Sequence, residues 1–147
     1  MMQIYNTIIT PFSELEKDVK KNYPGYEIHV DKKLRLTNDR VEELRDGLKP
    51  VAIRTYDGKV RIPLLDRWRL PVYETTPDNL GDEGMFVGYI YIPKVLIAIR
   101  KDFPKSISNL DGFKDNKDMA RGLMPYYGPS TEKSVYSAYI LTKFVEK

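Results

Sequence analysis

The chain has 147 residues, a net charge of +3, 41% hydrophobic and 31% charged residues, as expected of one folded domain rather than a disordered or polybasic protein. It has no cysteine and one histidine, which excludes disulfides, thiolate nucleophiles and Cys- or His-rich metal sites. The first residues lack the features of a signal peptide, and no stretch reaches the ~18–20 apolar residues of a membrane helix. We therefore expect a cytoplasmic protein (intracellular, not secreted) with no membrane contact.

The first segment predicts a strand followed by a helix. Residues 2–9 are rich in isoleucine and β-favouring residues and predict the strand. Ser13 and Glu16 have the spacing of a capping box, which predicts a helix over 14–22.

A short strand is expected over 26–30, and residues 34–36 are candidates for another. Residues 37–48 then predict a helix capped by Thr37 or Asn38. Its buried stripe would be Val41, Leu44 and Leu48.

The strongest local signal is Asp57-Gly58 between two alternating runs in residues 50–64, which predicts a β-hairpin. The two-residue turn would pair Tyr56 with Lys59 and oppose Arg54 to Arg61 across the strands. Opposed like charges destabilise a sheet unless an anion neutralises them. The remaining predicted pairs are Thr55 with Val60, Ile53 with Ile62, and Val51 with Leu64.

Residues 67–73 continue the alternation, with Trp68, Leu70 and Val72 toward the core. Pro71 lacks an N–H, which favours an edge strand or a strand end. Because the connector is short, we expect this strand to extend the hairpin into an antiparallel meander. The outer face of the meander would hold Arg54, Tyr56, Lys59, Arg61, Arg67, Arg69 and Tyr73.

The remaining segments are less clear. Residues 74–84 are turn-rich and acidic and predict a surface loop, followed by a strand over 85–92. Residues 94–101 fit a helix or a buried strand, and we favour the strand because β-branched residues dominate.

Between 104 and 130 we expect loops with one short helix near 115–121, opened by Asp115. The last segment, 132–146, fits a helix, with a strand as the alternative.

These elements predict a single α+β domain over residues 1–147, with a mostly antiparallel sheet of five to six strands and two to three helices on one face. The expected core is Ile53, Val60, Ile62, Leu64, Trp68, Leu70, Phe86, Tyr89 or Ile90, Val95, Ile97 and Phe144.

Enzymatic signatures are weak, so we expect no catalytic residue, metal or cofactor. His29 has no nucleophile motif near it and is expected to be a structural or surface histidine. Phosphate-loop and dinucleotide motifs are absent, and the acidic runs lack the order of a calcium loop. A metal-dependent hydrolase built from carboxylates is the weakest of the alternatives.

The charge distribution carries the functional hypothesis. Residues 49–73 hold six basic side chains against Asp57 and Asp66, whereas residues 74–93 hold four acids and no base. The two blocks either neutralise each other or leave a basic Tyr/Arg face for an outside partner. Arginine binds phosphate and tyrosine stacks on bases.

We therefore expect a non-enzymatic binding protein that uses the 49–73 face for a phosphate-bearing ligand, a nucleic acid or nucleotide. Tyrosine and arginine are also enriched in protein interfaces, so the alternative is a structural or interaction protein with a protein partner, such as a capsid-type component or an inhibitor. Eleven tyrosines and the lack of cysteine would suit a viral or mobile-element protein.

Overall fold

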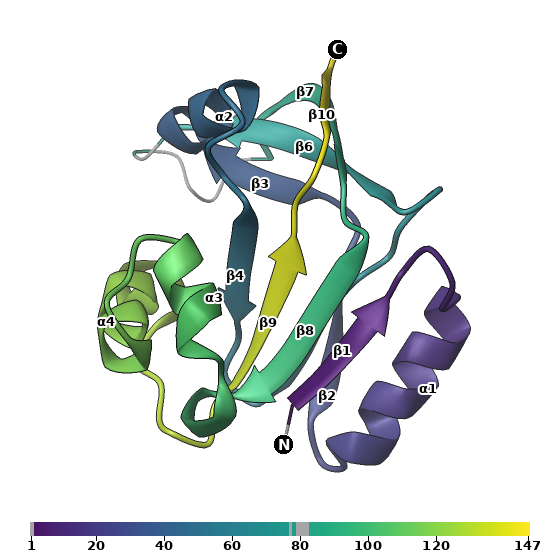
Figure 1. The fold of residues 1–147 in the computed structure, drawn as a ribbon, viewed down its shortest axis with the longest axis vertical. Coiled ribbons are helices and arrows are strands. Elements are labelled where there is room, and N and C mark those ends of the chain that lie inside the picture. Colours follow the sequence, from purple (N-terminus) through teal and green to yellow (C-terminus); the bar gives the residue numbers. More distant parts are fainter. Residues whose placement is uncertain (1, 77, 79–82) are drawn as a thin grey trace.

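The computed structural model describes residues 2–76, 78 and 83–147 and shows the expected α+β fold (Figure 1). These residues form ten strands in three sheets and four α-helices, more than the single sheet of five to six strands and the two to three helices expected. A four-stranded antiparallel sheet with the order β1-β8-β9-β4 forms its centre. Its strands are β1 (Met2–Asn6), β8 (Lys94–Ile99), β9 (Val135–Ile140) and β4 (Val51–Thr55).

A second sheet, in the order β10-β7-β6-β3, crosses one end of the first (Figure 1). It is antiparallel except for the parallel pair β3–β6. Two further strands, β2 and β5, pair in parallel with each other. The strands of these two sheets are β3 (Leu34–Thr37), β6 (Arg69–Thr75), β7 (Met85–Tyr91), β10 (Phe144–Glu146), β2 (Glu27–Asp31) and β5 (Lys59–Pro63).

The helices cover different parts of the sheets rather than one face, contrary to expectation (Figure 1). They are α1 (Phe12–Asn22), α2 (Asn38–Arg45), α3 (Lys105–Leu110) and α4 (Asn116–Tyr127), and a 3₁₀ turn, η2 (Arg100–Asp102), precedes α3. Helix α1 lies beside β1, and α2 lies over the second sheet. Helices α3 and α4 pack together on the face of the central sheet that is turned away from the second sheet.

Strands β8, β9 and β4 of the central sheet are buried on both faces. Val95, Ile97 and Tyr139 pack toward the second sheet and α1, whereas Leu96 and Tyr136 pack toward α3 and α4. Strands that are covered on both sides read as continuous apolar runs without alternation. For this reason the segments 94–101 and 132–146 resembled helices in sequence. The first is β8, as favoured; the second forms β9 and β10, so its predicted helix is wrong and the alternative strand is right.

The hairpin prediction is correct only at its turn. Tyr56 and Lys59 pair across Asp57-Gly58, and Gly58 has the positive φ of 69° that the turn requires. Beyond the turn the strands separate, because β4 pairs with β9 and β5 pairs with β2. Arg54 therefore lies opposite Ser137, and Arg61 opposite His29, so the predicted Arg54–Arg61 pairing is wrong.

The predicted meander is also wrong, since β6 lies between β7 and β3 in a different sheet from β5. β6 is not an edge strand. The pairing of β6 with β3 begins only at Val72. Pro71 precedes it, so the N–H that proline lacks is not needed for a hydrogen bond to β3. A turn with positive φ at Arg67 and Trp68 connects β5 to β6 and leaves Trp68 exposed.

Most of the predicted core is confirmed. Ile53, Val60, Ile62, Leu70, Ile90, Val95 and Ile97 are buried, whereas Phe86, Tyr89 and Phe144 are half-buried. The predictions for Leu64, Trp68 and Leu48 are wrong, because these side chains are exposed. Leu48 follows the end of α2 and therefore leaves the buried stripe formed by Val41 and Leu44.

Two helix starts test the capping predictions. Asp115 caps α4 through a bond that its side chain accepts from the backbone N–H of Asp118, as expected. The Ser13 box is wrong, because α1 already begins at Phe12 after Pro11. α4 also runs to Tyr127, across residues expected to form a loop.

Candidate ligand pocket

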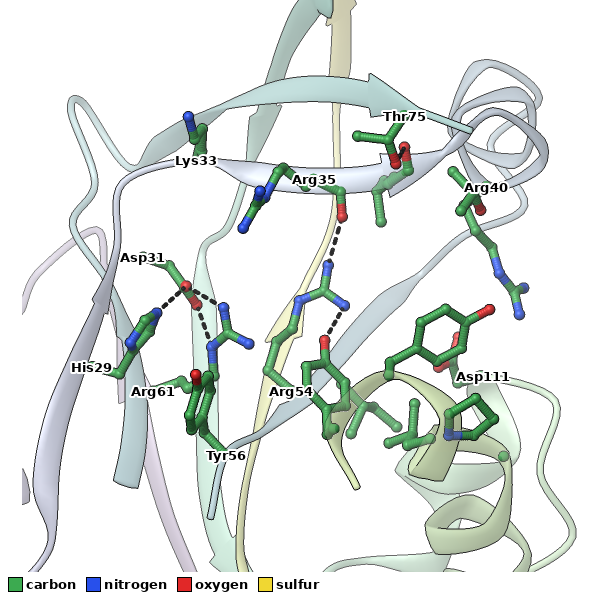
Figure 2. A pocket seen from close by; sticks show the side chains of 18 of the residues that line it. His29, Asp31, Lys33, Arg35, Arg40, Arg54, Tyr56, Arg61, Thr75 and Asp111 are labelled. Carbon is green, nitrogen blue, oxygen red and sulfur yellow. Dashed lines mark hydrogen bonds and ion pairs between the residues drawn. The ribbon is translucent and has the colours of Figure 1, made fainter. Parts of the chain in front are cut away.

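A pocket of about 950 Å³ opens between the β2–β3 segment, β4, β5 and α4 (Figure 2). Seven of its lining residues are lysine or arginine and two are aspartate. The cations are Lys32, Lys33, Arg35, Arg40, Lys49, Arg54 and Arg61.

On one side of the pocket, Asp31 is the centre of a buried polar cluster (Figure 2). Its carboxylate is 5% exposed and accepts two bonds from Arg61, at 2.6 and 3.2 Å. The Tyr139 hydroxyl donates a third at 2.5 Å, and His29 Nε2 lies 3.5 Å away. Two strands of one parallel pair therefore supply the ion pair, since Asp31 ends β2 and Arg61 lies on β5.

The cluster changes the pKa of its members. Burial opposes the charge on Arg61, but the hydrogen bonds and charge of Asp31 outweigh it and raise the pKa of Arg61. Burial, followed by the charge of Asp31, raises the pKa of Tyr139 well above its ordinary value. At neutral pH Arg61 is thus charged and forms an ion pair with Asp31.

Arg54 has a different environment. It lies between the Asp31 cluster and Arg40 in Figure 2. Its guanidinium donates to the Tyr127 hydroxyl at 2.9 Å and to the Arg35 carbonyl at 3.4 Å. Both acceptors are uncharged, so within the described residues the Arg54 guanidinium is held in one orientation but forms no ion pair.

A second buried ion pair lies on the other side of Arg54. Lys49 Nζ is 3.3 Å from Asp111, and their side chains are 5% and 11% exposed. Burial lowers the pKa of Lys49; Asp111 opposes this shift, and the charges of Arg54 and Arg40 add to it. Arg40 itself pairs with Glu43. Lys49, Arg40 and Arg61 each pair with a carboxylate, whereas Arg54 contacts no carboxylate among the described residues.

Aromatic rings form part of the wall. His29 stacks on Tyr56 with ring centroids 5.3 Å apart and an angle of 17°. The Arg61 guanidinium lies 5.8 Å from the Tyr56 centroid and 5.6 Å from that of Tyr127. Tyr56 and Tyr126 are 43% and 58% exposed, so their rings are accessible to a ligand.

The structure divides the predicted binding residues into two groups. Arg54, Tyr56 and Arg61 line the pocket, and Lys59 lies against the Tyr56 ring at its rim. Arg67, Arg69 and Tyr73 belong to the turn and strand of the second sheet and line no part of the pocket.

Sequence reasoning missed His29, Lys49 and Tyr127 as pocket residues. His29 was expected to be a structural or surface residue, and Tyr127 lies in the last part of α4, which was expected to be a loop. The Lys49–Asp111 pair joins residues 62 positions apart, which no local pattern signals.

The acidic segment, residues 74–93, was a candidate to neutralise the basic residues 49–73. Its described ion pairs are instead with cations outside that range. Glu83 pairs with Lys33 at 2.5 Å, and Glu74 lies 3.9 Å from Arg45. Residues 77 and 79–82 of that segment lie outside the described residues. The counter-charge of Arg61 is Asp31, which the charge count had not singled out.

Within the described ranges, no group of three or more His, Asp or Glu side chains is arranged to hold a metal ion. No helix among these residues is long and apolar enough to cross a membrane.

No protein-family model matches the chain, and no curated protein matches it. Two solved structures are similar in fold, both of mutant ZmASCH from Zymomonas mobilis. The serine-to-alanine mutant has 14% identity and a TM-score of 0.49, over 84% of this chain and 73% of that one. The tyrosine-to-phenylalanine mutant has 15% identity and a TM-score of 0.46, over 82% and 72%. Likeness at this level says nothing about function.

The titration of His29 reports directly on the electrostatic environment of the pocket. His29 is the single histidine of the chain, so its imidazole signals are unambiguous. Burial, then the charge of Arg61, lowers its pKa below 6.5. The unfolded chain therefore binds this proton more tightly, so the contribution of His29 to folding stability is present above pH 6.5 and is lost as pH falls from 6.5 through the folded pKa. We expect the imidazole NMR signals to titrate below pH 6.5. Titration at or above that pH in the free protein would contradict this geometry.

Proposed function

We propose that the protein binds a phosphate-bearing ligand, a nucleotide or a single-stranded nucleic acid, in this pocket. The observation that carries the proposal is Arg54, a fixed guanidinium whose hydrogen bonds go to uncharged oxygens in a pocket lined by an excess of cations. Guanidinium groups bind phosphate oxygens bidentately, which makes phosphate a chemically suitable counter-charge.

The aromatic wall supports a ligand with a base. The stacked His29–Tyr56 pair and the exposed ring of Tyr126 offer flat apolar surfaces within the same pocket as Arg54. Bases stack on such rings with little dependence on sequence. A cavity of about 950 Å³ is also within the range of sites that enclose a small molecule or one segment of a strand.

Arg61 has a supporting role in this proposal. Its paired state with Asp31 fixes the β2–β5 wall and presents the guanidinium to the faces of Tyr56 and Tyr127. We assign the phosphate contact to Arg54 and not to the opposed pair of arginines that the sequence suggested.

The test compares thymidine, thymidine 5′-monophosphate, a single-stranded eight-nucleotide oligo(dT) and a hairpin in which linked oligo(dA) and oligo(dT) arms stay paired, by calorimetric titration. We expect the monophosphate to bind and thymidine to bind far more weakly. The single strand should bind more tightly than the duplex, with a log–log salt slope of about −0.7 for each phosphate contacted.

Two results would contradict the proposal. Equal binding of thymidine and its monophosphate would remove the phosphate contact. Absence of binding by every ligand at 50 mM salt would leave a protein partner as the better account of the pocket.

A further inference from the structure

The outer face of the second sheet carries a continuous row of aromatic side chains, here termed the aromatic strip: Tyr73, Phe86 and Tyr89. In β6 the buried residues Leu70 and Val72 alternate with outward ones, and Tyr73 is among the latter. The rings follow one another with centroids 5.8 Å apart for Tyr73–Phe86 and 5.2 Å for Phe86–Tyr89. All three are half-buried, so part of each ring is open to a ligand.

A cation lies at each end of the aromatic strip. Lys33 Nζ is 4.9 Å from the Tyr73 centroid, and the Arg69 guanidinium carbon is 4.0 Å from the Tyr89 centroid. Arg69 Nε is buried and, among the described residues, has no hydrogen-bond partner. A buried donor without an acceptor costs stability, so hydrogen bonding within the described residues does not explain the position of Arg69.

The aromatic strip continues from the pocket. Lys33 lines the pocket and also lies over Tyr73, and Arg35, another lining residue, is the register partner of Tyr73. The Lys33–Glu83 pair joins a partly exposed and an exposed side chain, and such surface pairs contribute little to stability. The positive lining thus extends from Arg54 to the start of the aromatic strip.

Cross-strand aromatic pairs also stabilise sheets, as Tyr73–Phe86 does between β6 and β7. That role explains the ring contacts, but not a cation at both ends, an unpartnered guanidinium nitrogen and continuity with a basic pocket. Rings in a row with flanking cations are the arrangement that holds successive unpaired bases and their phosphates.

We propose that a single-stranded nucleic acid held by the pocket continues across the outer face of the second sheet. Its bases stack on Tyr73, Phe86 and Tyr89, and its phosphates contact Lys33 at the near end and Arg69 at the far end. This inference rests on the proposed function and extends it from one nucleotide to a strand of several nucleotides. A duplex cannot use the aromatic strip, because its bases are already paired and stacked.

The test is a length series of oligo(dT) from the monophosphate to eight nucleotides, titrated against the protein and the variant Phe86→Leu, Tyr89→Leu. For the native chain we expect affinity to rise about a thousandfold from one nucleotide to six, since each of the three stacked bases contributes about tenfold. In the variant the gain with length should fall about tenfold for each ring removed, while monophosphate affinity stays unchanged. The matched control is Tyr26→Leu, a half-buried tyrosine in edge contact with Tyr23 and remote from the strip.

A second readout needs no variant. Trp68 is the single tryptophan, is 42% exposed and lies 4.9 Å from Tyr91, the register partner of Arg69. Long oligonucleotides should change its fluorescence, and the monophosphate should not.

The outcomes separate the two proposals. Tight monophosphate binding with no gain in affinity for longer strands, or with a gain that the variant retains, would overturn the aromatic strip and leave the pocket intact. Failure of all lengths to bind would overturn the proposed function as well.

Discussion

Replacing Asp31 by alanine is expected to lower the free energy of unfolding by about 3–5 kcal/mol, because it leaves a buried guanidinium without its counter-charge. The Arg61 side chain is 15% exposed and receives both of its carboxylate contacts from Asp31. The Tyr139 hydroxyl, in a fully buried side chain, loses its acceptor at the same time. Thermal melting of a chain this size should fall by roughly 10 °C.

The matched control is Glu83→Ala, which removes an ion pair with an exposed carboxylate and should leave the melting temperature nearly unchanged. The double variant Asp31→Ala, Arg61→Met should be at least as stable as Asp31→Ala alone, since it no longer buries an unpaired charge. A melting temperature for Asp31→Ala within 2 °C of the native protein would show that the cluster does not hold the β2–β5 wall together.

Reversing the charge at Arg54 is the change expected to affect function most. Arg54→Glu places a carboxylate where the ligand phosphate is proposed to lie, so binding of thymidine monophosphate and of oligo(dT) should fall at least a hundredfold. The milder Arg54→Gln should cost about 1.5–3 kcal/mol of binding free energy, the usual contribution of a hydrogen bond to a charged group. It should also make the salt slope shallower by about 0.7.

Stability serves as the internal control for Arg54. Its hydrogen bonds go to uncharged groups, so Arg54→Gln should melt close to the native protein. Arg121→Glu makes the same charge reversal on α4, at a side chain that is 78% exposed and outside the pocket lining, and should leave binding nearly unchanged. If the two charge reversals weakened binding equally, the effect would belong to net charge and not to a phosphate contact at Arg54.

Arg54 and Arg61 show which structural features a local sequence pattern can predict and which it cannot. The sequence placed both in strands and correctly located the turn between them, because Asp57-Gly58 is a short-range signal. It could not show that the strands separate after one pair, because that depends on partners far along the chain. β4 pairs with β9, about 80 residues further along the chain, and β5 pairs with β2.

The separation of β4 and β5 also determines which partners the two arginine side chains contact. With the strands apart, Arg61 reaches Asp31 on β2, whereas Arg54 turns toward α4 and the carbonyl of Arg35. Two arginines of similar local context thus acquire different roles, one committed to an ion pair and one oriented with uncharged partners. No pattern within residues 49–73 distinguishes them.

By itself, the sequence determined the α+β class, the Asp57-Gly58 turn, the α1 and α2 segments, the Asp115 cap and most of the core, because these follow from local propensity and hydrophobic periodicity. Only the tertiary structure decided the sheet order, the strand identity of the final segment and the pocket. Strands buried on both faces lose the alternation that marks them, and a pocket assembled from β2, β4, β5 and α4 depends on contacts between segments that are distant in the chain.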